Sequence, residues 1–113
     1  MTIPTIGRIV HYTLTDEQAK QVNKRRTDAH ASGLHNNTAG LSVHFGNSVA
    51  GGDVFPLLIT RVWGPSETSA VNGQVFLDGN DPLWVMSTSV GDGPGRFTWP
   101  NTAVPATAFL EAK

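Results

Sequence analysis

The chain has 113 residues, of which 39% are hydrophobic, and a net charge of −1, so we expect a single domain with one modest core. The absence of Cys excludes disulfides and thiolate chemistry, and no apolar run is long enough to span a membrane. The near-neutral charge argues against duplex nucleic acid as a partner, and charged residues make up only 15% of the chain against about 25% in an average domain. A surface with so little charge favours a homo-oligomer or another protein partner.

Residues 7–14, GRIVHYTL, alternate in a way that predicts a first strand. Val10, Tyr12 and Leu14 share one face of that strand, because successive side chains point to opposite sides.

A helix is predicted over residues 16–27. Thr15 and Gln18 form a capping box, in which each side chain can accept a hydrogen bond from the other residue's backbone N–H. Acidic residues follow in the first turn, and Arg25 and Arg26 fall in the last turn, both favourable to the helix dipole. The apolar face is narrow, so we expect the helix to lie on the surface or against a neighbouring subunit; it consists of Ala19 and Val22.

Residues 28–40 show no periodicity and are predicted to form a long loop, followed by a short strand over 41–45 and a turn at Gly51-Gly52. Residues 53–63, DVFPLLITRVW, are apolar on both faces, which predicts a strand that is covered on both sides. Pro56 lacks a backbone N–H, so the start of this strand is expected at an edge or a bulge.

The next two strands, 71–77 and 83–90, flank Asp78-Gly79, a strong hairpin signal because Gly accepts the positive φ of a tight turn. A glycine-rich connection over 91–95 leads to a last short strand at 96–99. We therefore predict one domain over 1–113, with an ordered core over 7–99 and a tail over 100–113.

The fold class predicted from these elements is mainly β with one helix, in a small antiparallel β-barrel or rolled sheet. An SH3-like barrel is favoured, and an OB-like barrel or an open five-stranded sheet are the alternatives.

The sequence holds no nucleophile elbow, phosphate-binding loop or dinucleotide fingerprint, so we expect a protein that is not an enzyme and needs no cofactor. The Asp78–Asp81 run could supply a carboxylate pair or part of a calcium loop, but turn chemistry explains it as well, and no metal is expected. The four His residues could also form a metal site, although nothing in their spacing fixes one; they are His11, His30, His35 and His44.

Ligand binding is the better-supported class. Arginine pairs with phosphate through two parallel hydrogen bonds, and exposed Trp rings stack on bases. Arg25 and Arg26 would pair with phosphate, Trp84 or Trp63 would stack, and the hairpin side chains would bind sugar hydroxyls or exocyclic amines; the last group is Asp78, Asn80 and Asp81. We expect the hairpin to form one wall of such a site and the end of the helix another.

Four segments carry a resemblance to known proteins: GRIVHYTLT, the Asn23–Arg26 helix end, DVFPLLITRVWG and NGQVFLDGNDPLWV. Together, over residues 5–99, they resemble a group of small, functionally unassigned proteins of tailed phages and prophages. The loop at 27–40 is shorter than that group leads one to expect.

The resemblance implies a protein of the infected bacterial cell's cytoplasm or of the virion. One hypothesis is an anti-defence protein that sequesters a nucleotide-derived immune signal, as a homo-oligomer. The alternative is a virion structural protein, either a capsid decoration or a tail accessory protein, which packs against its neighbours in the particle.

Overall fold

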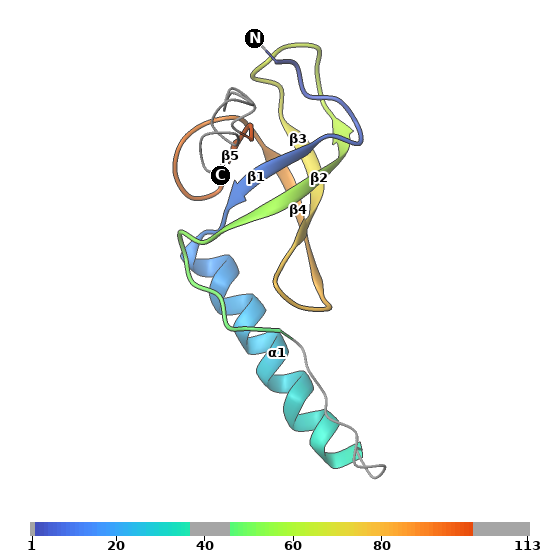
Figure 1. Cartoon of the computed structure of the whole chain (residues 1–113), viewed down its shortest axis with the longest axis vertical. Helices are drawn as coiled ribbons and strands as arrows, with labels where there is room; N and C mark the ends of the chain where they lie inside the picture. Colours follow the sequence, from blue (N-terminus) through green and yellow to red (C-terminus); the bar gives the residue numbers. More distant parts are fainter. Residues whose placement is uncertain (1, 37–45, 101–113) are drawn as a thin grey trace, which may run out of the picture.

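A computed structural model describes residues 2–36 and 46–100 of the chain, with residues 30–36 described by their backbone alone. The described elements are, in chain order, β1 (Ile9–Thr13), α1 (Asp16–Asn36), β2 (Val54–Val62), β3 (Val71–Phe76), β4 (Pro82–Thr88) and β5 (Phe97–Thr98). The strands form one five-stranded sheet in the order β4-β3-β2-β1-β5, and every neighbouring pair is antiparallel. The helix leaves one end of the strongly twisted sheet and extends away from it (Figure 1).

The sheet is not closed into a barrel, so the mainly β class is confirmed, whereas the closed SH3-like or OB-like barrel is wrong. The residues after β4 approach β5 through an isolated bridge between Val90 and Phe97. Gly93 and Gly95, with φ values of 94° and 80°, then turn the chain back toward β1. Because β5 is only two residues long, this edge offers too little backbone to close the sheet with a continuous ladder.

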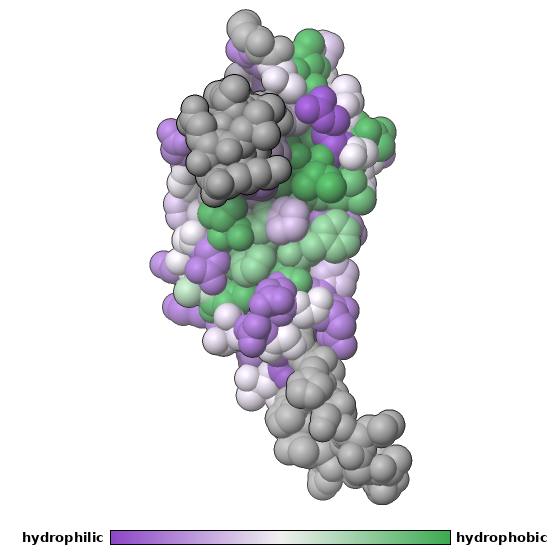
Figure 2. Space-filling view, in the orientation of Figure 1, coloured by the Kyte–Doolittle hydropathy of each residue, from purple (hydrophilic) through white to green (hydrophobic). Residues whose placement is uncertain are grey.

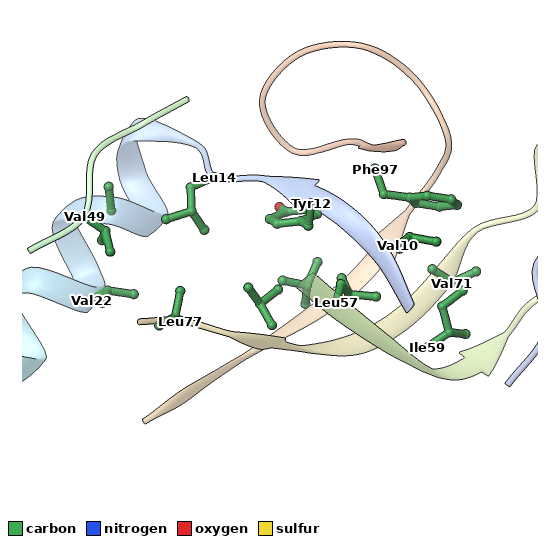
Figure 3. Close-up of a cluster of buried hydrophobic side chains, with 13 residues drawn as sticks. Val10, Tyr12, Leu14, Val22, Val49, Leu57, Ile59, Val71, Leu77 and Phe97 are labelled. Carbon is green, nitrogen blue, oxygen red and sulfur yellow. The ribbon is translucent and has the colours of Figure 1, made fainter. Parts of the chain in front are cut away.

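The core lies on one face of the sheet, which we call the inner face, and the opposite face is the outer face. The face predicted for β1 is confirmed, since Val10, Tyr12 and Leu14 are all buried. Figure 3 shows these side chains between β1 and the neighbouring strands, with Val22 and Val49 at the helix end of the cluster. The strands, together with the residue that follows β3, contribute the rest of the centre of the cluster, which includes Leu57, Ile59, Val71, Val75, Leu77, Val85 and Phe97.

The start of α1 follows the sequence prediction. The N–H of Gln18 donates to Thr15 Oγ1 at 3.0 Å, and the N–H of Thr15 donates to Gln18 Oε1 at 3.0 Å, which completes the capping box. Ala19 and Val22, the narrow apolar face, are buried.

The end of α1 differs from the prediction: the helix runs to Asn36, well past residue 27, so the predicted loop over 28–40 begins as helix. The predicted end rested on the cluster of basic residues, which is typical of the last turn of a helix. Basic side chains favour a helix end but do not impose one, and no Pro follows to break the helix. The predicted strand over 41–45 lies outside the described residues.

The strand predicted over 53–63 is β2, which lies in the middle of the sheet between β1 and β3. Pro56 pairs with His11 of β1, while the ladder with β3 begins only at Leu57, so Pro56 has a ladder partner on one side. The prediction that both faces are covered is wrong for the single chain, because Val54 on the outer face is 54% exposed. The hairpin prediction is confirmed: β3 and β4 pair up to Phe76 and Pro82, and the Asp-Gly turn lies between them.

Among the described residues, no helix is both long and apolar enough to cross a membrane.

Candidate functional site

The helix and the β3–β4 hairpin meet through a buried arginine. Arg26 exposes only 7% of its side chain, and its Nε and Nη2 donate to Asp81 Oδ1 at 3.0 and 2.9 Å. Its Nη1 donates to the carbonyl oxygen of Asn47. Arg26 therefore ties the helix to two separate segments, and all three of its nitrogens have acceptors.

Arg25 reaches the same carboxylate from the solvent side. Its Nε and Nη2 donate to Asp81 Oδ2 at 3.2 and 2.8 Å, and Nη2 also lies 3.2 Å from the carbonyl oxygen of Pro82. About half of the side chain is exposed, at 46%. One carboxylate thus holds two guanidinium groups, one buried and one accessible to solvent.

Asp81 is kept ionised by these two partners. Burial opposes its ionisation, but the hydrogen bonds and charges of Arg26 and Arg25 together outweigh that effect, so the pKa of Asp81 lies below its ordinary value. The carboxylate is consequently a permanent anion at neutral pH, and it fixes the position of both guanidinium groups.

The contact between Arg25 and Arg26 of α1 and the β3–β4 hairpin is called the junction below. The segment before β2 joins it through Asn47, which was not among the residues predicted from the sequence. Its backbone N–H donates to the carbonyl oxygen of Asp78 at 3.0 Å, and its Nδ2 donates to Asp78 Oδ2 at 2.6 Å. Gly46 forms an isolated bridge with Gly79. The only sequence signal for this role was a Gly-Asn pair, which predicts a turn and no particular partner.

Asn23 was also missed. Its Nδ2 donates to the carbonyl oxygen of Val49 at 2.7 Å, and its Oδ1 accepts from the N–H of Val49 at 2.9 Å. The amide of Asn23 thus pairs with both backbone groups of Val49, as a neighbouring strand would. These two hydrogen bonds fix the segment of residues 46–50 along the helix.

The hairpin bears a shallow depression of about 190 Å³, below the range of about 300–1,000 Å³ that is usual for small-molecule sites. It is lined by Phe76, Leu77, Gly79, Asn80, Asp81 and Pro82. Trp84 lies two residues beyond Pro82 on the same face of β4, and the residue is 54% exposed. The structure therefore brings the arginines, the hairpin polar residues and an exposed indole to one region.

Trp63 is not part of this region. It follows the end of β2 that pairs with Val71, at the far end of β3 from the hairpin. Its Nε1 donates to Asn72 Oδ1 at 3.1 Å, and the guanidinium of Arg61 lies 4.3 Å from its ring centroid. Of the residues predicted to bind a ligand, Trp63 alone lies away from the junction.

Charge at the junction is balanced. The junction holds two guanidinium groups, Arg25 and Arg26, which both pair with Asp81, and a second carboxylate, Asp78, which accepts a hydrogen bond from Asn47. The arginines were predicted to bind phosphate, but in the structure Asp81 already accepts their hydrogen bonds. An anion could bind here only if one arginine exchanged its partner.

For the residues that the structure describes, no group of three or more His, Asp or Glu side chains could hold a metal ion. His11 is exposed on β1. The side chains of His30, His35 and His44 lie outside the described part of the chain, so the four-His alternative is not tested.

Comparison of the chain with models of protein families, with curated proteins and with solved structures finds no match.

Proposed function

We propose that this chain is a non-enzymatic, phage-type binding protein that sequesters a nucleotide-derived small molecule at the junction of α1 and the β3–β4 hairpin. The observation that carries the proposal is the sharing of Asp81 between a buried and a half-exposed arginine. Arg26 alone satisfies Asp81 through three hydrogen bonds, so Arg25 is the partner that can exchange.

In the bound state Arg25 turns from Asp81 to a phosphate of the ligand, while Arg26 keeps the carboxylate in place. The exchange replaces one charge-assisted interaction of Arg25 by another, so it leaves no guanidinium unpaired. The exposed ring of Trp84 offers a stacking surface for a base, and Asn80 offers both a donor and an acceptor at the depression.

Calorimetry against a panel of cyclic nucleotides and cyclic ADP-ribose isomers tests the proposal. We expect binding of at least one compound by the wild type, and a loss of roughly tenfold or more in affinity for Arg25→Ala, because a phosphate partner is removed. Lys24→Ala is the matched control, since Lys24 is a neighbouring cation that pairs with Asp28 on the exposed side of the helix. Silence across the panel contradicts the proposal, as does equal weakening by both variants.

A second candidate is a virion structural protein, and the observation that favours it is the apolar outer face of the sheet. Ile9, Val54, Phe76, Trp84 and Met86 are each about half exposed or more on a single chain. Such a face fits packing against a neighbouring subunit of a particle. Stoichiometric amounts of the chain in purified particles, measured by mass spectrometry, would support this candidate and count against the first.

A further inference from the structure

The outer face of the sheet is a continuous apolar surface. Residues directly paired across neighbouring strands point to the same side, so one row crosses all four long strands, in the order Ile9, Leu58, Gln74 and Trp84. A second row contains His11 and Pro56, and its far end contains Phe76 and Pro82. Figure 2 shows hydrophobic side chains gathered over the sheet, between more polar regions of the surface.

This face carries little formal charge. Of the side chains that the strand register places on it, Arg61 is the one that carries a formal charge: it pairs with Asn72, which alternates with Gln74 and Phe76. The remaining members are Thr13, Val54, Thr60, Asn72, Met86 and Thr98. Charged side chains are what normally keep an exposed sheet apart from another copy of itself. Two identical copies of this face therefore bring together mainly uncharged side chains, with one charged residue, Arg61, on each copy.

The size of the face suits a dimer. Five of its apolar side chains are 49–61% exposed, and side chains of this size contribute on the order of 100 Å² each, or about 500 Å² together. This apolar area equals that of the largest apolar patches found on ordinary monomers. With the polar and proline members of the two rows, the face approaches the roughly 800 Å² per partner of a standard interface.

We infer that the outer face of the sheet is the interface between two copies of this chain, related by a two-fold axis. A two-fold interface needs a surface that is complementary to itself, and a mainly apolar sheet face with a single charged residue meets that requirement. The pairing also supplies the second cover that the two-sided apolar strand β2 lacks in the single chain.

The interface also adjoins the candidate site. Phe76 and Pro82 line the depression at the hairpin and belong to the outer face as well. Trp84 lies on the edge strand β4, at the rim of the face, so a base stacked on its ring would lie at the border of the interface. A second copy seated on the face adds a wall beside a depression that is too shallow to enclose a ligand alone. This consequence rests on the proposed function; the interface itself does not.

Sedimentation equilibrium of the full chain from low to high micromolar concentration tests the inference. We expect a dimer for the wild type and a rise in the dissociation constant of roughly tenfold or more for both Met86→Glu and Ile9→Glu, because each places two carboxylates at the interface. Neither residue lines the depression. Ile6→Glu is the matched control: Ile6 is 70% exposed in the turn before β1, off the sheet, and the variant should dimerise as the wild type does.

Circular dichroism separates a lost interface from a lost fold, since all three positions are exposed and the variants should keep the wild-type spectrum. A wild type that is monomeric throughout, or a dimer that both face variants leave unchanged, overturns the inference. Deletion of residues 101–113 should leave the dimer intact. If the chain dimerised only after that deletion, the tail of the same chain would be the occupant of the outer face, and the inference would be overturned. A dimer that binds nothing in the nucleotide panel supports the interface and contradicts the proposed function, whereas a monomer that binds does the reverse.

Discussion

Arg26 of α1 and Asp81 of the β3–β4 hairpin form a two-point ion pair, with Nε and Nη2 at 3.0 and 2.9 Å from Oδ1, across 55 positions of sequence. The arginine is buried, whereas the carboxylate keeps 22% of its side chain exposed and has Arg25 as a second partner. The pair is the main polar connection between a helix that extends away from the sheet and the hairpin beside it (Figure 1).

The first prediction concerns the unequal weight of the two arginines. Arg26→Ala should lower the free energy of unfolding by about 2 kcal/mol, because it removes the hydrogen bonds to Asp81 and leaves the carbonyl of Asn47 without its donor. Arg25→Ala should lower it by less than about 1 kcal/mol, since that side chain is half exposed and its ion pair is screened by water. Urea denaturation measures both, and equal losses would show that the buried arginine has no special role in stability.

The second prediction concerns acid. Because the folded state lowers the pKa of Asp81, the ion pair contributes its full stability above the pKa of the unfolded chain, about 3.9, and loses it as the pH falls through the folded value. Asp81→Asn should therefore cost about 2 kcal/mol at neutral pH, and the difference from the wild type should narrow below about pH 4. Unfolding curves at a series of pH values measure this. A difference that stayed constant into acid would exclude ionisation of Asp81 as its source.

Local patterns explain why the strands and the start of the helix could be predicted. The alternation over 7–14 places Val10 and Tyr12 on the face that is buried, and the capping box at Thr15 forms as expected. Asp-Gly between two apolar runs likewise predicts the hairpin that connects β3 and β4. Each of these features is decided by residues close in sequence, so the sequence contains the whole signal.

Other features depend on distant partners and could not be predicted in the same way. The arginines and Asp81 were each candidates for ligand contacts, but no local pattern shows that they bind one another across the fold. The helix end was misplaced because a basic cluster is compatible with both an end and a continuation. Closure of the sheet likewise depends on how much of the chain after β4 pairs with β5, and here a single bridge forms.

The third prediction concerns Tyr12, which is the only tyrosine of the chain and is 2% exposed. Burial raises the pKa of Tyr12, so the stability that its neutral form contributes is complete below the unfolded value of about 10 and is lost as the pH rises through the folded value. Absorbance at the tyrosinate band should show a titration displaced to higher pH than in the urea-unfolded chain. The Tyr12→Phe variant, which also lacks the 2.9 Å hydrogen bond to Gln18, is the control without a signal. Coincident folded and unfolded titrations would contradict the burial of this ring.

The last prediction concerns Gly73, in the middle of β3. A Cβ added there would meet the side chain of Leu57 and lie 2.5 Å from the carbonyl oxygen of Leu58, so neighbouring backbone as well as a core side chain would have to move. Gly73→Ala should therefore lower the free energy of unfolding by about 1–3 kcal/mol, the usual cost of overpacking a core, despite the higher intrinsic stability of Ala in a strand. Gly91→Ala is the matched control, because the nearest atoms to its new Cβ, at 3.2 and 3.3 Å, belong to the flexible side chain of Arg96, and we expect a change of less than about 0.5 kcal/mol. Chemical denaturation of both variants measures the difference. If the two substitutions had the same small effect, β2 and β3 could not approach one another at Gly73 as closely as the structure describes.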